Sequence, residues 1–221
     1  MFSLKKRPIA AVALAASLAA MVSLSLSTAA HAATPKTGSA CAVSGQVIAT
    51  AKFTMVCSAA SANTPSQPAK LTWGKQLPVS KANLVMADAW VKSIDLKSST
   101  WGPMTGAFGT FVNPSSKPVR IVAAYTSSAE FVQLHEVVTA DGKMIMQQKQ
   151  GGFTVPAKGT KQMKPGADHT MFMNLKGSVN PGDLIYVTYV TSTGARFTQP
   201  FLAKVYSGGN ETYNPSGTST M

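Results

Sequence analysis

Histidine and methionine side chains stand close together in the second half of this chain. The stretch DHTMFM, residues 168–173, places His169 two residues before Met171 and four residues before Met173. Alternate side chains of an extended strand share one face, so these three are expected on one face, with Thr170 and Phe172 on the other. The stretch is compatible with a metal site and also with the ordinary packing of a β-strand.

The second candidate histidine also has methionines nearby. His135 stands in LHEVV, and ten residues separate it from Met146, which follows Met144 at strand spacing. The DG pair at 141–142 is a strong signal for a β-hairpin, which would bring His135 beside these methionines. Twenty-two residues then separate Met146 from His169. The spacing predicts a site to which several strands contribute.

These side chains favour monovalent copper. Neutral imidazole nitrogens and thioether sulfurs, with no carboxylate among them, suit Cu(I) better than zinc, calcium or magnesium. A blue-copper centre needs a cysteine beside the histidines, and both cysteines lie far upstream. Thioethers are not lost to disulfides in an oxidising compartment. The predicted ligands are His135, Met146, His169 and Met171, with Met144 and Met173 as secondary candidates whose alternative role is to fill the core or its rim.

The elements that must position these residues are predicted to be β-strands. From residue 84 onward, short alternating apolar segments such as GAFGTFVN, VRIVAAYTS and LIYVTYVT are separated by turn residues, including NPGD at 180–183. No segment of helical period and useful length follows residue 80. Several short strands with regular turns are typical of an all-β Greek-key sandwich or barrel. The polar residues 208–221 are predicted to be a disordered tail.

The spacing and its surroundings resemble the periplasmic copper chaperones of the PCuAC type. The signature of that family is His, ten residues, Met, about twenty-one residues, then His-x-Met, and residues 84–206 follow it with His135, Met146, His169 and Met171. The flanking segments LHE, DGKMIM, VPAKGTKQMKPGADHTMFM and GDLIYVTYV follow the family's layout. This chain departs from the family in one additional residue between Met146 and His169, and in Glu136, where many members have methionine.

The resemblance implies a cupredoxin-like domain over residues 83–207 that captures Cu(I) outside the cytoplasmic membrane. It also implies a recipient, the dinuclear copper centre of a cytochrome c oxidase subunit, or another copper assembly factor. Two alternatives stay open: copper sequestration by the same ligands, and a metal-free interaction module of the cell envelope. No nucleophile motif or paired carboxylates accompany the histidines, so an enzyme is not expected. A chaperone site is expected to be shallow and exposed, so that a recipient's ligands can enter.

The N-terminus predicts export. Lys5-Lys6-Arg7 precede an apolar run that ends in Ala30-His31-Ala32, the pattern of a secretory signal with cleavage after residue 32. The alternative, a retained membrane anchor, fits less well because serines interrupt the run. No later segment is long and apolar enough to span a bilayer. We therefore expect a signal peptide over residues 1–32 and a mature protein in the periplasm, the cell envelope or the extracellular space.

Export makes a disulfide the expected state of the two cysteines. Fifteen residues separate Cys41 from Cys57, and oxidising compartments favour disulfides. The alternative, a pair of soft metal ligands, lacks a nearby histidine or third cysteine. Cys41 follows GSA well beyond the apolar run, which argues against a lipid-modified cysteine. The segments QVIATA and KFTMVC are predicted to form a disulfide-closed hairpin in a small module, residues 33–82, that looks like those at the start of some bacterial secreted proteins.

The composition narrows the classes of partner. The chain of 221 residues is 45% hydrophobic and 13% charged, which is typical of a folded, β-rich secreted protein. Its formal charge of +12 is compatible with binding to nucleic acid or to an anionic envelope surface, and also with a soluble basic surface. The lysines are scattered singly, and no basic cluster with interleaved aromatic residues follows the first ten residues, so nucleic acid is not an expected partner.

Overall fold

The computed structural model describes residues 34–59, 70–100, 102–140, 142–208 and 212–214. The signal peptide predicted for residues 1–32, Asp141 of the predicted hairpin turn and most of the predicted tail lie outside these ranges. Within them the regular elements are all strands. A search of the same residues for an apolar helix of membrane-spanning length finds none. The prediction of an all-β fold is confirmed.

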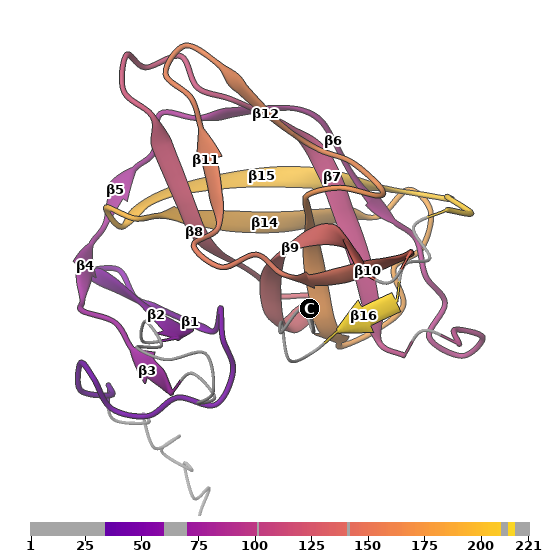
Figure 1. Cartoon of the computed structure of the whole chain (residues 1–221), viewed down its shortest axis with the longest axis horizontal. Coiled ribbons are helices and arrows are strands. Elements are labelled where there is room, and N and C mark those ends of the chain that lie inside the picture. Colours follow the sequence, from indigo (N-terminus) through magenta and orange to yellow (C-terminus); the bar gives the residue numbers. More distant parts are fainter. Residues whose placement is uncertain (1–33, 60–69, 101, 141, 209–211, 215–221) are drawn as a thin grey trace, which may run out of the picture. The chain divides into compact units, whose positions relative to one another are not determined.

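A closed barrel of seven strands positions the candidate site (Figure 1). In the order in which they pair, its strands are β8 (Val119–Thr126), β14 (Leu184–Thr191), β15 (Ala195–Lys204), β6 (Val85–Lys92), β7 (Met104–Val112), β13 (His169–Leu175) and β9 (Ala129–Ala140). A pairing between β9 and β8 closes the ring. β15 and β6 run parallel, whereas β13 is antiparallel to both β7 and β9. Neighbours in the barrel are mostly not consecutive in sequence, as in Greek-key folds.

Shorter strands extend the barrel sheet. They are β5 (Ser80–Lys81) beside β15, β10 (Lys143–Gln148) beside β9, β11 (Phe153–Val155) beside β8, β12 (Thr160–Met163) beside β7, and β16 (Thr212–Asn214) beside β10. Ala140 pairs with Lys143, and Gly142 has a φ of 72°, as the predicted β9–β10 hairpin requires. Figure 1 shows β16 next to β10, to which it is parallel. The tail therefore contains a strand where the sequence predicts disorder, because the open edge of β10 offers backbone partners.

Both faces of β13 are buried, which distinguishes it from a strand with one face in solvent. Thr170 and Phe172 face the barrel core, where Phe172 belongs to the main hydrophobic cluster. His169, Met171 and Met173 alternate with them and lie on the opposite face, where the two methionines belong to a separate cluster. The alternation predicted for DHTMFM is therefore present, and other parts of the chain cover its histidine and methionine face.

A smaller sheet precedes the barrel in sequence. It contains β1 (Val47–Ala49), β2 (Phe53–Ala59), β3 (Leu71–Trp73) and β4 (Leu77–Pro78), with β1 and β2 as the predicted hairpin. Cys41 and Cys57 form a disulfide, so the prediction of a disulfide is confirmed. Among the described residues, the buried cluster of this sheet holds Met55, Cys57 and Trp73. Such a small core needs support from a covalent staple and from neighbouring contacts.

Hydrogen bonds tie this small sheet to the barrel. Arg196 of β15 donates to Thr54 Oγ1 and to the carbonyl oxygen of Phe53, each over 2.8 Å. Thr54 is completely buried. A hydrogen bond from a charged donor to a buried acceptor is stronger than one between neutral groups. Arg196 therefore anchors β2 independently of the disulfide.

Removing the disulfide is expected to loosen the small sheet while the barrel stays folded. In a Cys41→Ser/Cys57→Ser variant, the local stability of β1–β3 should fall by about 2 kcal/mol, because the crosslink no longer restricts the unfolded loop. Hydrogen exchange at the Gly45 and Trp73 amides, which donate to Cys57 O and Ser39 O, should accelerate about 30-fold. Core amides such as that of Phe172 serve as the control. Equal acceleration in the barrel, or complete abolition of Cu(I) binding, would contradict a barrel that stays folded without the disulfide.

Candidate metal centre

The two candidate histidines lie directly opposite each other on neighbouring strands. His169, the first residue of β13, pairs with His135 of β9. The centroids of their imidazole rings are 5.5 Å apart, and the ring planes meet at 73°. Directly opposite residues of antiparallel strands place their side chains on the same face. The register of β13 and β9 therefore brings together the two imidazoles that sequence spacing proposed as partners.

The predicted methionine ligands lie on the same face as the histidines. Met171 follows His169 at strand spacing, and Met146 of β10 pairs with Val137, two residues along β9 from His135. Met146 and Met171 belong to one buried cluster. The structure thus brings all four predicted ligands into one region that spans β9, β10 and β13.

The two secondary candidates have different surroundings. Met173 belongs to the same buried cluster as Met146 and Met171. Met144 is 48% exposed and lies outside that cluster. Of the two, only Met173 is placed where it can replace a lost thioether.

Met104 is a further thioether that sequence reasoning missed. It is the first residue of β7, where it pairs with Met173 of β13, and it packs against the methionine cluster. The stretch GPMTGAF carries no motif that singles it out, because the partner of a strand residue depends on the register with another strand. The sequence signal that could have indicated Met104 is the alternation of side chains along β7. Met104 lies on the same strand face as Gly106, and Gly106 pairs with Met171.

A cavity of about 200 Å³ opens beside these side chains. Its lining includes Met104, Met146, His169 and Met171, together with residues of the segments 92–99 and 165–166. The four predicted ligands are buried, and none is more than 5% exposed. This differs from the expected shallow, exposed site, because the connections before β7 and β13 border the cavity. An ion or an incoming ligand would reach the methionines through this cavity.

His135 is a neutral donor. Burial and, to a lesser extent, the charge of His169 lower the pKa of His135 to about 3, so that its imidazole is uncharged at neutral pH. Among the residues that the structure describes, no three His, Cys, Asp or Glu side chains gather as a metal site. A metal held between these two histidines would therefore take its remaining ligands from thioethers, which are soft.

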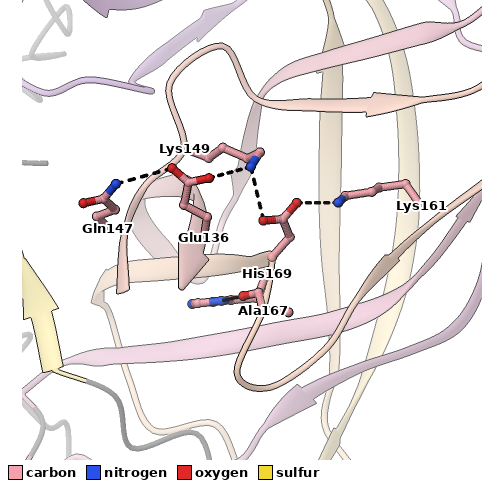
Figure 2. Close-up of polar contacts among 7 residues, drawn as sticks. Glu136, Gln147, Lys149, Lys161, Ala167 and His169 are labelled. Carbon is pink, nitrogen blue, oxygen red and sulfur yellow. Dashed lines mark hydrogen bonds and ion pairs between the residues drawn. The ribbon is translucent and has the colours of Figure 1, made fainter. Parts of the chain in front are cut away.

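A network of charged side chains lies close to His169 (Figure 2). Lys149 Nζ lies 2.5 Å from Glu136 Oε2 and 3.5 Å from Asp168 Oδ1, and Lys161 Nζ lies 2.5 Å from Asp168 Oδ2. Glu136 follows His135 in sequence, and Asp168 precedes His169. Partly exposed ion pairs contribute little individually. The network nevertheless links the β9 and β13 segments that carry the histidines, and it gives Glu136, the departure from the family pattern, a role in ion pairing.

Each histidine also makes a hydrogen bond through one ring nitrogen. His169 Nδ1 donates to the carbonyl oxygen of Ala167 over 2.8 Å, as Figure 2 shows. His135 Nε2 is hydrogen-bonded over 2.8 Å to Oε1 of Gln133, a buried residue on the same strand. Such bonds through one nitrogen fix the ring orientation and leave the other nitrogen to face a metal. Sequence reasoning missed Gln133, whose position two residues before a candidate ligand is the only sequence signal.

Comparison with known proteins places residues 84–201 in a family described as "Putative lipoprotein LpqE-like". A relative from Leifsonia xyli subsp. xyli (strain CTCB07), "Putative lipoprotein Lxx21020", is 38% identical over 139 residues, which are 62% of this chain and 80% of that protein. Similar solved structures include the copper-bound PCuAC domain from PmoF2 (13% identity, TM-score 0.45, 57% of this chain and 97% of that one). Another is the solution structure of CuI-DR1885 from Deinococcus radiodurans (27% identity, TM-score 0.43, 57% and 80%).

The TM-scores of these two structures are below 0.5, so neither likeness establishes a function. The family match is independent of these structures and spans residues 84–201, which include most of the barrel. The chain therefore belongs to the LpqE-like lipoprotein family.

Proposed function

We propose that this protein is an exported copper chaperone that binds one Cu(I) ion through His135, Met146, His169 and Met171. The carrying observation is the pair of opposed histidines beside a buried methionine cluster. Among the described residues, no third His, Cys, Asp or Glu side chain joins the two histidines as a possible metal ligand. Neutral nitrogen and thioether donors match a soft monovalent ion. Because these ligands are neutral, the full charge of the ion stays uncompensated in the buried site. This cost is smaller for a monovalent ion than for a divalent one, so the site disfavours a divalent metal.

Delivery is the second part of the proposal. The cavity that reaches Met146, His169 and Met171 gives a recipient's ligand access to the ion before the donor ligands leave. The PCuAC resemblance implies that the recipient is the dinuclear copper centre of cytochrome c oxidase, or an assembly factor that serves it. Membership of a lipoprotein family and the presence of a disulfide indicate an exported protein of the cell envelope, where such recipients would be met.

Both cysteines of the chain are used by the disulfide. A thioether-linked lipid on Cys41 would require its sulfur to be free, so the disulfide excludes lipid attachment at this residue in the oxidised protein. The disulfide supports the interpretation, made from the GSA sequence and the distance to the apolar run, that Cys41 is not a lipid-modified cysteine.

Sequestration is a second candidate, favoured by the burial of all four ligands. A storage site gains from ligands that solvent and competitors do not reach, whereas a chaperone must release its ion. Incubating the Cu(I)-loaded protein with a copper-free oxidase subunit distinguishes the two. Transfer within minutes supports delivery, and retention of copper over hours supports sequestration.

The ligand set makes a direct spectroscopic prediction. X-ray absorption of the Cu(I)-loaded protein is expected to show both nitrogen and sulfur scatterers, because imidazoles and thioethers bind the same ion. A Met146→Leu/Met171→Leu variant should lose part of its sulfur scattering, because only Met104 and Met173 of the cluster remain as thioethers, while it keeps nitrogen scattering. A Met55→Leu variant, which alters a buried methionine of the small sheet, should leave the spectrum unchanged. A wild-type spectrum with nitrogen or oxygen neighbours alone would reject the proposed site, and absence of bound copper would favour a metal-free interaction module.

A further inference from the structure

The hydrogen bonds of Gln133 determine which nitrogen of His135 carries the proton. Gln133 Nε2 donates to the backbone carbonyl oxygen of Ser44 over 3.3 Å, and Gln133 Oε1 lies 2.8 Å from His135 Nε2. A carbonyl oxygen only accepts hydrogen bonds, so the amide nitrogen must face Ser44 and the amide oxygen must face His135. That oxygen also only accepts. His135 Nε2 is therefore the protonated nitrogen, and the lone pair of the neutral ring is on Nδ1.

His169 shows the opposite arrangement. Its Nδ1 lies 2.8 Å from the carbonyl oxygen of Ala167, which can only accept. His169 Nδ1 is therefore protonated in the neutral ring, and the lone pair is on Nε2. The two facing imidazoles thus offer different nitrogens to an ion.

The Ser44 carbonyl is held by the disulfide-closed module. The next residue, Gly45, donates its amide to the carbonyl oxygen of Cys57 over 2.9 Å, and Cys57 forms the disulfide. Gly45 has a φ of 85°, and a Cβ on it would lie 3.1 Å from the carbonyl oxygen of Val132 and 3.3 Å from Gln148 Nε2. The loop at 44–45 therefore lies close against β9 and β10, the two strands that carry His135 and Met146.

We propose that Gln133 is a positioning residue that fixes His135 in its Nε2-protonated tautomer, and that the Cys41–Cys57 module sets the orientation of Gln133 through Ser44. Where the proposed copper function holds, His135 then binds the ion through Nδ1 and His169 binds it through Nε2. This gives the N-terminal module a role in the metal centre, in which it orients a ligand that lies on another sheet. A metal-ligating histidine commonly has its second nitrogen fixed in this way by an outer partner.

The tautomers are measured without copper. Long-range ¹H–¹⁵N correlation spectra of the copper-free full chain at pH 7 are expected to show an Nε2-protonated His135 and an Nδ1-protonated His169. Gln133→Leu should shift His135 toward a mixture of tautomers, leave His169 unchanged, and lower Cu(I) affinity about 10-fold. Gln133→Glu should keep the Nε2-protonated form, because a carboxylate oxygen still accepts a hydrogen bond from His135 Nε2–H. Gln162→Leu, at an exposed glutamine, is the control and should match the wild type.

Two glycines test the role of the module. Gly38 and Gly45 both have a left-handed φ, 82° and 85°, but a Cβ on Gly38 would meet nothing within 4 Å. Both alanine substitutions therefore introduce similar backbone strain, and only Gly45→Ala pushes the loop away from β9. Gly45→Ala is expected to perturb the His135 tautomer and weaken Cu(I) binding, whereas Gly38→Ala should do neither.

The outcomes separate this proposal from the proposed function. An Nδ1-protonated His135 in the wild type, or a Gln133→Leu variant with the wild-type tautomer, would overturn the positioning role. Identical behaviour of the two glycine variants would overturn the role of the module. If the tautomers are as expected and the wild-type protein does not bind Cu(I), the positioning of His135 stands, while the assignment of ligand atoms and the copper function both fall.

Discussion

Replacing His169 with alanine is expected to weaken Cu(I) binding about 100-fold or more, which is at least about 2.8 kcal/mol of binding free energy. Replacing Met171 with alanine should weaken it less than about 10-fold. The site has two imidazoles but several thioethers, because Met173 shares the face of β13 with Met171, and Met104 lies opposite Met173 on β7. A lost thioether therefore has a neighbour that can take its place, and a lost imidazole does not.

Cu(I) affinities of a set of methionine variants test whether one thioether can replace another. A Met171→Ala/Met173→Ala variant should bind Cu(I) more weakly than either single variant, because it removes both the ligand and its nearest substitute. Competition titration against a Cu(I) chelator measures each affinity. Met163→Ala, at a methionine buried in the barrel core away from the site, controls for general loss of stability and should keep the wild-type affinity. If His169→Ala also binds as the wild type does, this face of β13 is ordinary packing.

Lowering the pH from 7 to 4 is expected to destabilise the copper-free protein by about 3 kcal/mol through His135 alone. Burial, reinforced by the charge of His169, lowers the pKa of His135 to about 3, whereas an unfolded histidine titrates near about 6.5. Between these values the unfolded chain binds a proton that the folded chain does not. The contribution of His135 to stability is therefore complete above pH ~6.5 and is lost as the pH falls toward about 3.

A neutral replacement isolates this contribution. The free energy of unfolding is measured with urea at several pH values from 7 to 4 for the wild type and for His135→Gln. The value for the wild type minus that for the variant should fall by about 3 kcal/mol as the pH falls. Carboxylates that titrate in this range are the same in both proteins, so their contributions cancel in the difference. Parallel curves for the two proteins would show that His135 is as easily protonated in the folded chain as in the unfolded one.

The barrel could be predicted from the sequence because its signals are local. Alternation of apolar residues, the DG pair at 141–142 and the NPGD turn each act within a few residues, and the β9–β10 hairpin and β14 follow them. The disulfide could also be predicted locally, from two cysteines that follow a predicted export signal. Where alternation alone decides which face a side chain takes, as along DHTMFM, the sequence is sufficient.

The remaining parts of the site depend on how distant segments meet. The roles of Met104 and Gln133 could not be predicted from the sequence. Met104 lies opposite Met173 because of the register between β7 and β13, and Gln133 meets Ser44 because the small sheet packs near β9. The burial of the ligands depends on the connections that border the cavity, and periodicity within a strand carries no information about them. The strand β16 forms because β10 has an open edge, which is a property of the assembled sheet.

The charged network beside the histidines has a consequence for the kinetics of copper exchange. The chain carries a formal charge of +12, and a basic protein repels a monovalent cation as it approaches. Glu136 and Asp168, which adjoin the two histidines in sequence, are matched by Lys149 and Lys161. The cavity that reaches the methionines is lined by Lys92 and Asp95, one charge of each sign, so the charges around the site nearly cancel. Added salt should then leave the capture of free Cu(I) nearly unchanged, since there is little local field to screen. The basic residues elsewhere on the surface act over about a Debye length, and they would accelerate the encounter with a protein whose surface is acidic.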